Sequence, residues 1–170
     1  MRVHRLVSSI LDANCYVVDL EDAIIIIDPC VEYERIKEVI SQKKIDAVFL
    51  THGHADHFWT IESILSKETV PIYCHKNALK KLENWKTNYS FIIKQAFSIK
   101  TASKDIRFVS EGYQMINQHR IKILETPGHS DCSISILSNN AIFTGDTLFY
   151  RSIGRSDLFS SSPDDLRRSL

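Results

Sequence analysis

Short apolar runs alternate with helical periodicities along the first half of the chain. The run at residues 23–27 contains four consecutive isoleucines, which predicts a strand covered on both faces. Ile36, Val39 and Ile40 then recur at helical spacing, and a further apolar run follows at residues 45–50. This alternation predicts an α/β domain built in layers. The expected elements are strands over 2–7, 14–20, 23–27, 45–50 and 70–74, and helices over 31–44, around Phe58, Ile61, Ile64 and Leu65, and over 78–85.

The second half of the chain returns to short strands. Residues 77–103 mix lysine, aromatic and isoleucine residues, and beyond the helix at 78–85 they predict only an irregular connection. Ser162, Pro163 and Asp165 form the capping pattern of a helix start. No repeat, linker or low-complexity segment interrupts the sequence, so we expect one domain over residues 1–170. The strands expected here cover 106–109, 113–116, 121–125, 134–137 and 141–144.

Composition and charge exclude several classes of partner. The chain has 170 residues, of which 44% are hydrophobic, enough for a sizeable core. Lys and Arg (21) balance Asp and Glu (21) without a basic cluster, which argues against a nucleic-acid partner. No apolar run reaches the length of a membrane span, and the N-terminus lacks a signal-peptide core. The four cysteines form no CxxC pair, so we expect reduced thiols and a cytoplasmic protein.

A cluster of metal-ligand residue types directly follows the predicted strand at 45–50. The sequence HGHADH at 52–57 brings three imidazoles and one carboxylate together. Zinc, iron and manganese accept these ligands, and burying such groups without partners is costly. The segment therefore predicts a metal site. The alternative is a solvent-exposed polar loop that happens to be rich in histidine.

Two later strands also end in ligand-type residues. His129 follows the predicted strand at 121–125, and Asp146 follows the one at 141–144, each beside a glycine. Three strands thus present His or Asp at their ends, which is hard to explain as chance. Cys132 lies close enough in sequence to be a soft ligand, but a small packed side chain is the simpler interpretation. The isolated His75 is interpreted as an ordinary residue.

HGHADH, TPGHS and GDTLF, in this order, resemble the motifs of the metallo-β-lactamase fold, and most closely those of its glyoxalase II-like hydrolases. The resemblance extends over nearly the whole chain. It implies a four-layer αββα sandwich with two metal ions at one edge of its two sheets. The implied ligands form two sets that share one carboxylate. They are His52, His54 and His129 for the first ion, Asp56 and His57 for the second, and Asp146 between the two.

The resemblance implies a hydrolase that uses zinc, with iron or manganese as the other candidates. Two divalent ions lower the pKa of a bound water towards ~7, and the resulting hydroxide attacks an acyl carbonyl. Asp56 is the candidate catalytic residue that orients the hydroxide. A thioester suits a site without an obvious general acid, because a thiolate leaves without prior protonation. The implied partner is therefore a small-molecule thioester, and the oligomeric state stays open.

Several positions depart from the glyoxalase II pattern. The two residues that contact glutathione after GDTLF align with Arg155 and Asp157, so Arg155 is a candidate for substrate binding and the second contact is lost. The helical domain that holds much of the glutathione has no counterpart, which argues against glutathione as the thiol. Asp28 either supports the metal ligands or caps the next helix. Phe58 and Trp59 replace small residues and are expected to narrow the pocket.

In the family pattern the helix that starts at Ser162 leads to a strand and to a Gly-His-Gly turn, whose His completes the second metal site. The sequence stops at Leu170, so we expect a C-terminally truncated domain whose second site lacks one donor. Three functions remain open: a metal-dependent thioester hydrolase, an iron persulfide dioxygenase and an inactive metal-binding fragment. The dioxygenase would use one iron held by His52, His129 and Asp146. A β-lactamase of the cysteine-containing class is disfavoured, because Asp146 occupies the place of its cysteine.

Overall fold

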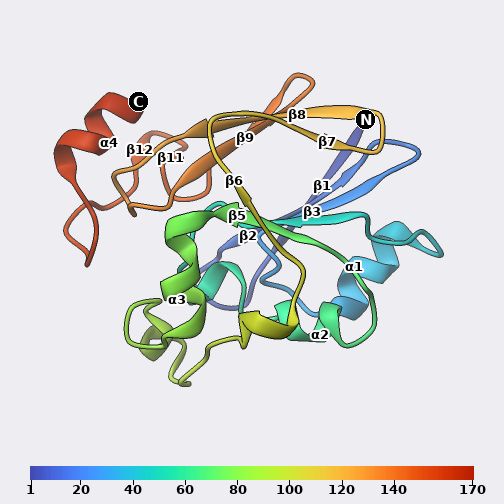
Figure 1. The fold of residues 1–170 in the computed structure, drawn as a ribbon, viewed down its shortest axis with the longest axis horizontal. Coiled ribbons are helices and arrows are strands. Elements are labelled where there is room, and N and C mark those ends of the chain that lie inside the picture. The colour runs from blue at the N-terminus through green and yellow to red at the C-terminus, as the bar shows by residue number, and fades with distance from the viewer.

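Two β-sheets stack face to face in the computed structural model (Figure 1). The structure describes residues 1–170, apart from the side chain of Ile92. The larger sheet has six strands in chain order, and the smaller sheet has four in the order β10-β9-β8-β7. The six strands are β1 (Arg2–Val7), β2 (Asn14–Asp19), β3 (Ile24–Ile27), β4 (Ala47–Phe49), β5 (Ile72–His75) and β6 (Ile106–Val109). The four are β7 (Gly112–Ile116), β8 (His119–Glu125), β9 (Ile134–Ser138) and β10 (Ala141–Phe143).

The four isoleucines of β3 show how the layers are held together. Successive side chains of a strand point to opposite faces of its sheet. Ile24 and Ile26 accordingly pack in the core beneath the helices, whereas Ile25 and Ile27 pack against the four-stranded sheet. All four are almost fully buried, which confirms the predicted coverage on both faces.

Three short helices cover the outer face of the six-stranded sheet (Figure 1). They are shorter than the periodicity predicts. The first ends at Ile40 rather than at residue 44, because Ser41 adopts a left-handed conformation with φ of 54°. The helices are α1 (Tyr33–Ile40), α2 (Ile61–Leu65) and α3 (Leu79–Glu83), with 3-10 turns η1 (Ala55–His57), η2 (Lys76–Ala78), η3 (Ser90–Ile93) and η4 (Thr101–Ser103).

A fourth helix, α4 (Pro163–Ser169), lies beside the four-stranded sheet (Figure 1). Ser162 caps it, since its hydroxyl accepts a hydrogen bond from the backbone N–H of Asp165 at 3.2 Å, as the capping pattern predicts. The backbone N–H of Ser162 donates to the carbonyl of Gly128 at 2.8 Å, and Leu166 is buried. The helix is therefore attached to the loop that carries His129.

Four strands deliver side chains to one edge of the molecule. β3 and β4 are parallel, so Asp28 and the segment from residue 51 follow them at the same end. β8 and β10 both pair antiparallel with β9, so His129 and Asp146 also emerge together. A backbone hydrogen bond from Ile134 to the carbonyl of Thr51, at 2.8 Å, links the two sheets at this edge.

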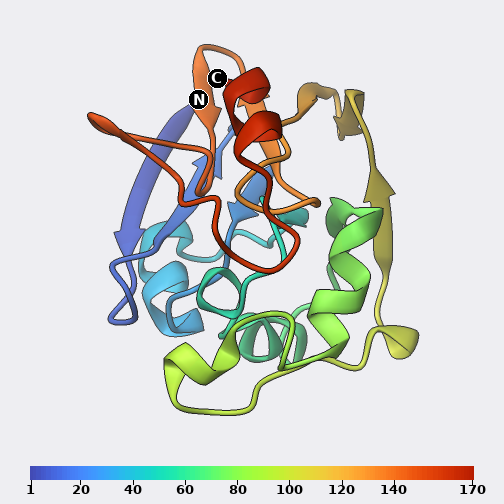
Figure 2. The ribbon, with the colours of Figure 1, turned by 90° about the vertical axis from the view of Figure 1, so that its left-hand side faces the viewer.

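Sequence reasoning missed a small hairpin beyond β10. Its strands, β11 (Leu148–Phe149) and β12 (Ser152–Ile153), are only two residues long, and Figure 2 shows the hairpin extending away from the body of the molecule. Tyr150, at its tip, is 86% exposed. Among the described residues, no helix is long and apolar enough to cross a membrane.

Candidate metal centre

Five predicted ligands come together at the edge where the strands end. His52 and His54 follow β4, and His129 follows β8 from the other sheet. Each of these three buried imidazoles offers one nitrogen, and the three nitrogens lie within 4.8 Å of one another. His52, His57 and Asp146 form a second group within the same limit. Residues far apart in sequence therefore supply two sets of metal donors that share His52.

The ring orientation of His52 is fixed by a chain of hydrogen bonds. The hydroxyl of Thr51 donates to Oδ2 of Asp28 at 2.6 Å, so its oxygen accepts from Nδ1 of His52 at 3.1 Å. Nδ1 thus carries the proton, and Nε2 keeps its lone pair. This Nε2 is buried, and it has no hydrogen-bond partner among the described residues.

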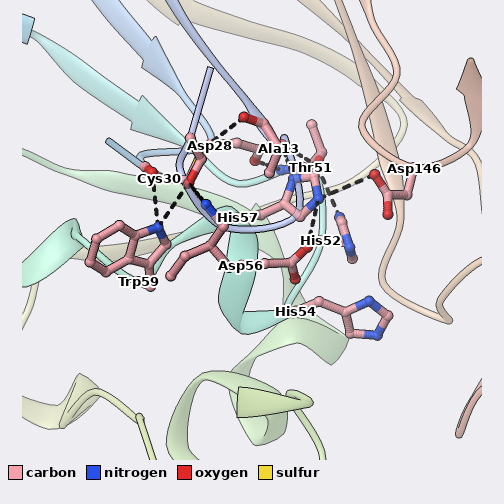
Figure 3. A network of polar contacts seen from close by, with 12 residues as sticks. Ala13, Asp28, Cys30, Thr51, His52, His54, Asp56, His57, Trp59 and Asp146 are labelled. Atoms are coloured by element: carbon pink, nitrogen blue, oxygen red, sulfur yellow. Dashed lines mark hydrogen bonds and ion pairs between the residues drawn. The ribbon is translucent and has the colours of Figure 1, made fainter. Parts of the chain in front are cut away.

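Asp28 orients a second imidazole as well. Its Oδ2 accepts a hydrogen bond from Nδ1 of His57 at 2.8 Å, and its Oδ1 accepts from the backbone N–H of Thr51 at 2.7 Å (Figure 3). Asp28 is buried and lies in the left-handed region with φ of 54°. The N-cap of α1 is Glu32. Of the two alternatives for Asp28, support of the histidines is therefore correct and capping is wrong.

His129 and Asp146 connect the two groups of donors. Nδ1 of His129 donates to the carbonyl of Arg155 at 2.9 Å, which leaves Nε2 with a lone pair that faces Nδ1 of His54 at 3.0 Å. The two carboxylate oxygens of Asp146 divide between the groups: Oδ2 lies 3.5 Å from Nε2 of His129, and Oδ1 lies 3.2 Å from Nε2 of His57. Asp146 thus lies between the two groups of donors.

Burial and the neighbouring rings keep three of the imidazoles neutral. The pKa values of His52 and His54 lie well below the ordinary value, mainly because burial disfavours the charged form and because the other histidines are nearby. Burial also lowers the pKa of His129. Neutral imidazole is the form that binds a metal ion, so these rings are already in the required state.

His57 lies in an acidic environment. Burial alone would lower its pKa, but the carboxylates of Asp146, Asp56 and Asp28 together raise it well above the ordinary value. Burial alone would raise the pKa of Asp146. His57 and the other histidines lower it more, and it falls to about 2. A positive charge is therefore favoured between His57 and Asp146.

These donors fit a divalent metal ion. The Nε2 atoms of His52 and His54 are buried, and neither has a hydrogen-bond partner in the described part of the chain. Burying such polar atoms without a partner is unfavourable. Two imidazole nitrogens that face each other at 3.0 Å, with a carboxylate beside them, can share a cation. The predicted cluster is thus a divalent metal centre.

Two glycines allow the close approach of backbone that the centre needs. Gly145 adopts a left-handed φ of 50°, and a Cβ there would overlap the side chain of Thr51. A Cβ at Gly154 would overlap the carbonyl oxygen of Asp146. Side chains at these positions would displace the groups that orient His52 and hold Asp146.

A cavity of about 410 Å³ opens beside Asp56, His57 and Asp146. Arg5, Asn14, Tyr16 and the residues Leu148–Phe149 of the hairpin line its other walls. Phe58 and Trp59 do not belong to this lining, so the expectation that they narrow the pocket is wrong. Phe58 is fully buried in the core, and Nε1 of Trp59 donates to the carbonyl of Cys30 at 2.9 Å, which directs its ring away from the donors (Figure 3).

Three predicted residues lie beside the two donor groups. Oδ2 of Asp56 is 3.7 Å from Nε2 of His57, and burial raises the pKa of this carboxyl group. The guanidinium of Arg155 pairs with Asp157 at 2.8 Å and is largely exposed, while its backbone carbonyl contacts His129. Cys132 is buried in the hydrophobic core, where burial raises the pKa of its thiol. It is therefore a packed side chain.

Sequence reasoning missed two residues that contact the histidines. Thr51 links His52 to Asp28, and a hydroxyl directly before the first histidine was the available signal. The ring of Tyr89 lies edge-to-face on His54 with centroids 5.0 Å apart. Tyr89 belongs to the irregular connection, whose course the sequence pattern does not predict.

Comparisons with known proteins place this geometry in a family. The "Probable metallo-hydrolase YqgX" of Bacillus subtilis (strain 168) is 29% identical over 174 residues, covering 100% of this chain and 82% of that protein. The solved structure "Crystal structure of BLEG-1 B3 metallo-beta-lactamase" is similar with a TM-score of 0.89 and 26% identity, over 99% of this chain and 83% of that one. "Crystal structure of TTHA1623 in a di-iron-bound form" has a TM-score of 0.82 and 26% identity, over 99% and 84%.

A model of the family described as the metallo-beta-lactamase superfamily matches residues 10–170, almost the full chain. The match includes the three motifs that carry the donors and the strands that position them. Relatives named as probable metallo-hydrolases support a metal-dependent hydrolase. The chain belongs to the metallo-beta-lactamase superfamily.

Proposed function

We propose that residues 1–170 form a single metallo-β-lactamase-like domain that hydrolyses thioesters or related acyl compounds, in the manner of the glyoxalase II-like hydrolases. The observation that carries this proposal is the pair of donor groups beside a cavity. His52, His54 and His129 would hold the first ion, and Asp56 and His57 the second. Asp146 would bridge them, because its two oxygens face different histidines.

Bound there, a divalent cation supplies Lewis acidity, which polarises an acyl carbonyl and lowers the pKa of a water molecule. The protein supplies orientation. Asp28 holds the proton of His57 on Nδ1, and through Thr51 it does the same for His52, so that both Nε2 atoms face the site. Asp56 lines the cavity, and its raised pKa suits a carboxylate that orients a water molecule and accepts its proton.

The cavity supports a small acyl substrate. Its volume of about 410 Å³ falls within the usual range of small-molecule sites. Apolar side chains of the β11–β12 hairpin form one wall, and Arg5 and Asn14 form another. A thiolate leaves without prior protonation, so a thioester makes the least demand on this site for a proton donor. Zinc is the proposed metal, and the di-iron form of the TTHA1623 relative supports iron as the other candidate.

A specific geometry supports the persulfide dioxygenase as the second candidate. Nε2 of His129 lies 3.5 Å from Asp146, and His52 shares a donor group with each of them. Two histidines and one carboxylate are the ligand set of non-haem iron oxygenases. In this reading a single iron would suffice. An inactive metal-binding fragment is the third alternative, and it predicts neither activity.

Thiol release and oxygen uptake distinguish these functions. Purified protein, loaded in turn with Zn²⁺, Fe²⁺ or Mn²⁺, should release thiol from a panel of small thioesters and lose this activity with a chelator. His54→Ala should abolish thiol release, whereas the matched variant His75→Ala should keep it, because His75 contacts Glu125 outside both donor groups. Oxygen consumption with a persulfide, in the absence of thioester cleavage, would overturn the hydrolase proposal.

A further inference from the structure

A buried lysine lies behind the metal centre. Lys81, on α3, is only 3% exposed, although lysine is rarely buried unless its charge is paired. Its ammonium group pairs with the carboxylate of Asp131. Taking an ammonium group out of water is costly, and an apolar side chain of similar size would often serve stability equally well. The pair therefore calls for a role beyond stability.

The stem of Lys81 supports the first histidine segment. Gly53 separates His52 from His54, and a Cβ at Gly53 would lie 2.8 Å from Cβ and 3.1 Å from Cδ of Lys81. Contacts this short would force a shift, so the backbone of the HGH segment lies directly against the lysine stem. α3 thus limits movement of the backbone between His52 and His54.

The head of Lys81 holds the second histidine segment. Asp131, its partner, lies two residues after His129. Asn77 of η2, just before α3, also contacts this turn after His129: its side-chain amide donates to the carbonyl of Asp131 at 3.2 Å. One short stretch, from η2 to α3, therefore contacts both segments that supply the first group of donors, although they come from different sheets.

We infer that Lys81 and Asp131 form a brace that positions His129 against His52 and His54 for metal binding. Lys81 is a positioning residue, since its ammonium acts through Asp131 and its stem through Gly53. The inference rests on the proposed metal site and deepens it. Groups that orient metal ligands commonly contribute about 10–100-fold to metal affinity. Such a brace sets the distance between His129 on one sheet and His52 and His54 on the other. A hydrogen bond to one imidazole fixes only the orientation of that ring.

The test compares metal affinity and ligand geometry in variants of the full chain. Lys81→Met keeps the stem on Gly53 and removes the charge, Asp131→Asn removes the partner at the surface, and Lys81→Arg keeps both features. Lys104→Met is the matched control, because Lys104 pairs with Glu62 of α2 at 2.8 Å. The readouts are the zinc dissociation constant, by competition with a chromophoric chelator, and the absorption spectrum of the Co²⁺-substituted protein.

Lys81→Met and Asp131→Asn should bind zinc about 10–100-fold more weakly and change the Co²⁺ spectrum, whereas the Arg variant and the control should resemble the wild type. If the first two variants lose thermal stability but keep wild-type affinity and spectrum, the brace is refuted while the proposed metal centre stands. Asp131 is half exposed, so its variant tests the inference even if Lys81→Met does not fold. A wild-type chain that binds no metal through these histidines would overturn both proposals.

Discussion

Replacing Asp28 with asparagine is the sharpest test of how the donors are oriented. Oδ2 of Asp28 accepts two hydrogen bonds, from the hydroxyl of Thr51 at 2.6 Å and from Nδ1 of His57 at 2.8 Å. In Asp28→Asn, Oδ1 still accepts from the backbone of Thr51, but an amide N–H₂ takes the place of Oδ2. This amide cannot accept the proton of His57. The ring must move or transfer its proton to Nε2, and either change removes the nitrogen that faces Asp146.

The magnitude follows from the loss of one orienting partner. We expect the affinity of the second group for metal to fall about 10–100-fold, which is roughly 1.4–2.8 kcal/mol. The first group should lose less, because Thr51 can still accept the proton of His52. Leaving a buried donor without a partner should also lower the free energy of unfolding by about 1–3 kcal/mol.

The assay is a zinc titration monitored by competition with a chelator, on protein whose fold is checked by near-UV circular dichroism. Asp22→Asn is the matched control: Asp22 also accepts a hydrogen bond from a histidine, His119, but on the surface. It should bind zinc as the wild type does. If folded Asp28→Asn protein takes up two zinc equivalents with unchanged affinity, then Asp28 does not set the orientation of these rings.

Three further outcomes are expected. His54→Ala should reduce the bound metal in elemental analysis, and His75→Ala should not. The reverse result would show that the assignment of the metal ligands is wrong. Dialysis against a chelator should lower the melting temperature, because bound metal at 100 times its dissociation constant stabilises the fold by about 2.7 kcal/mol. An unchanged melting temperature would exclude tight metal binding. The β11–β12 hairpin exposes the apolar side chains of Tyr150 (86%) and Ile153 (49%). The double variant Tyr150→Ser/Ile153→Ser should therefore show less self-association than the wild type in light scattering. Equal scattering from the two proteins would refute this.

The strands could be predicted because they are apolar runs bounded by turns. β1 matches its prediction residue for residue, and β3 and β4 begin or end within a few residues of theirs. The helix at 31–44 was predicted too long, since its end depends on the left-handed Ser41, for which periodicity gives no signal. The β11–β12 hairpin has too few residues for any alternation to appear.

The donors could be predicted for a similar reason, and their supports only in part: support of the ligands was one of two alternatives for Asp28, whereas Thr51, Lys81 and Asp131 were not predicted as supports. His52 and His54 follow one predicted strand and His129 follows another, and these strands end at the same edge of the two sheets. The contact of Asp28 with His57 spans 29 positions, and the pair of Lys81 and Asp131 spans 50. Neither pair shares a local pattern: the pairing of β3 with β4 brings Asp28 to His57, and the packing of the two sheets brings Asp131 to Lys81.

Both donor groups include His52, and this sharing limits how metal can bind. Nδ1 of His52 is occupied by Thr51, so Nε2 is its single free nitrogen, and one nitrogen binds one ion. When His52 joins His54 and His129, an ion in the second group depends on His57, one oxygen of Asp146, and Asp56 at 3.7 Å from the ring. The first group is thus complete in neutral imidazoles, whereas the second relies on carboxylates. Under the proposed function, hydrolysis with two ions needs the second group to be filled, whereas oxygen chemistry with one iron at His52, His129 and Asp146 does not.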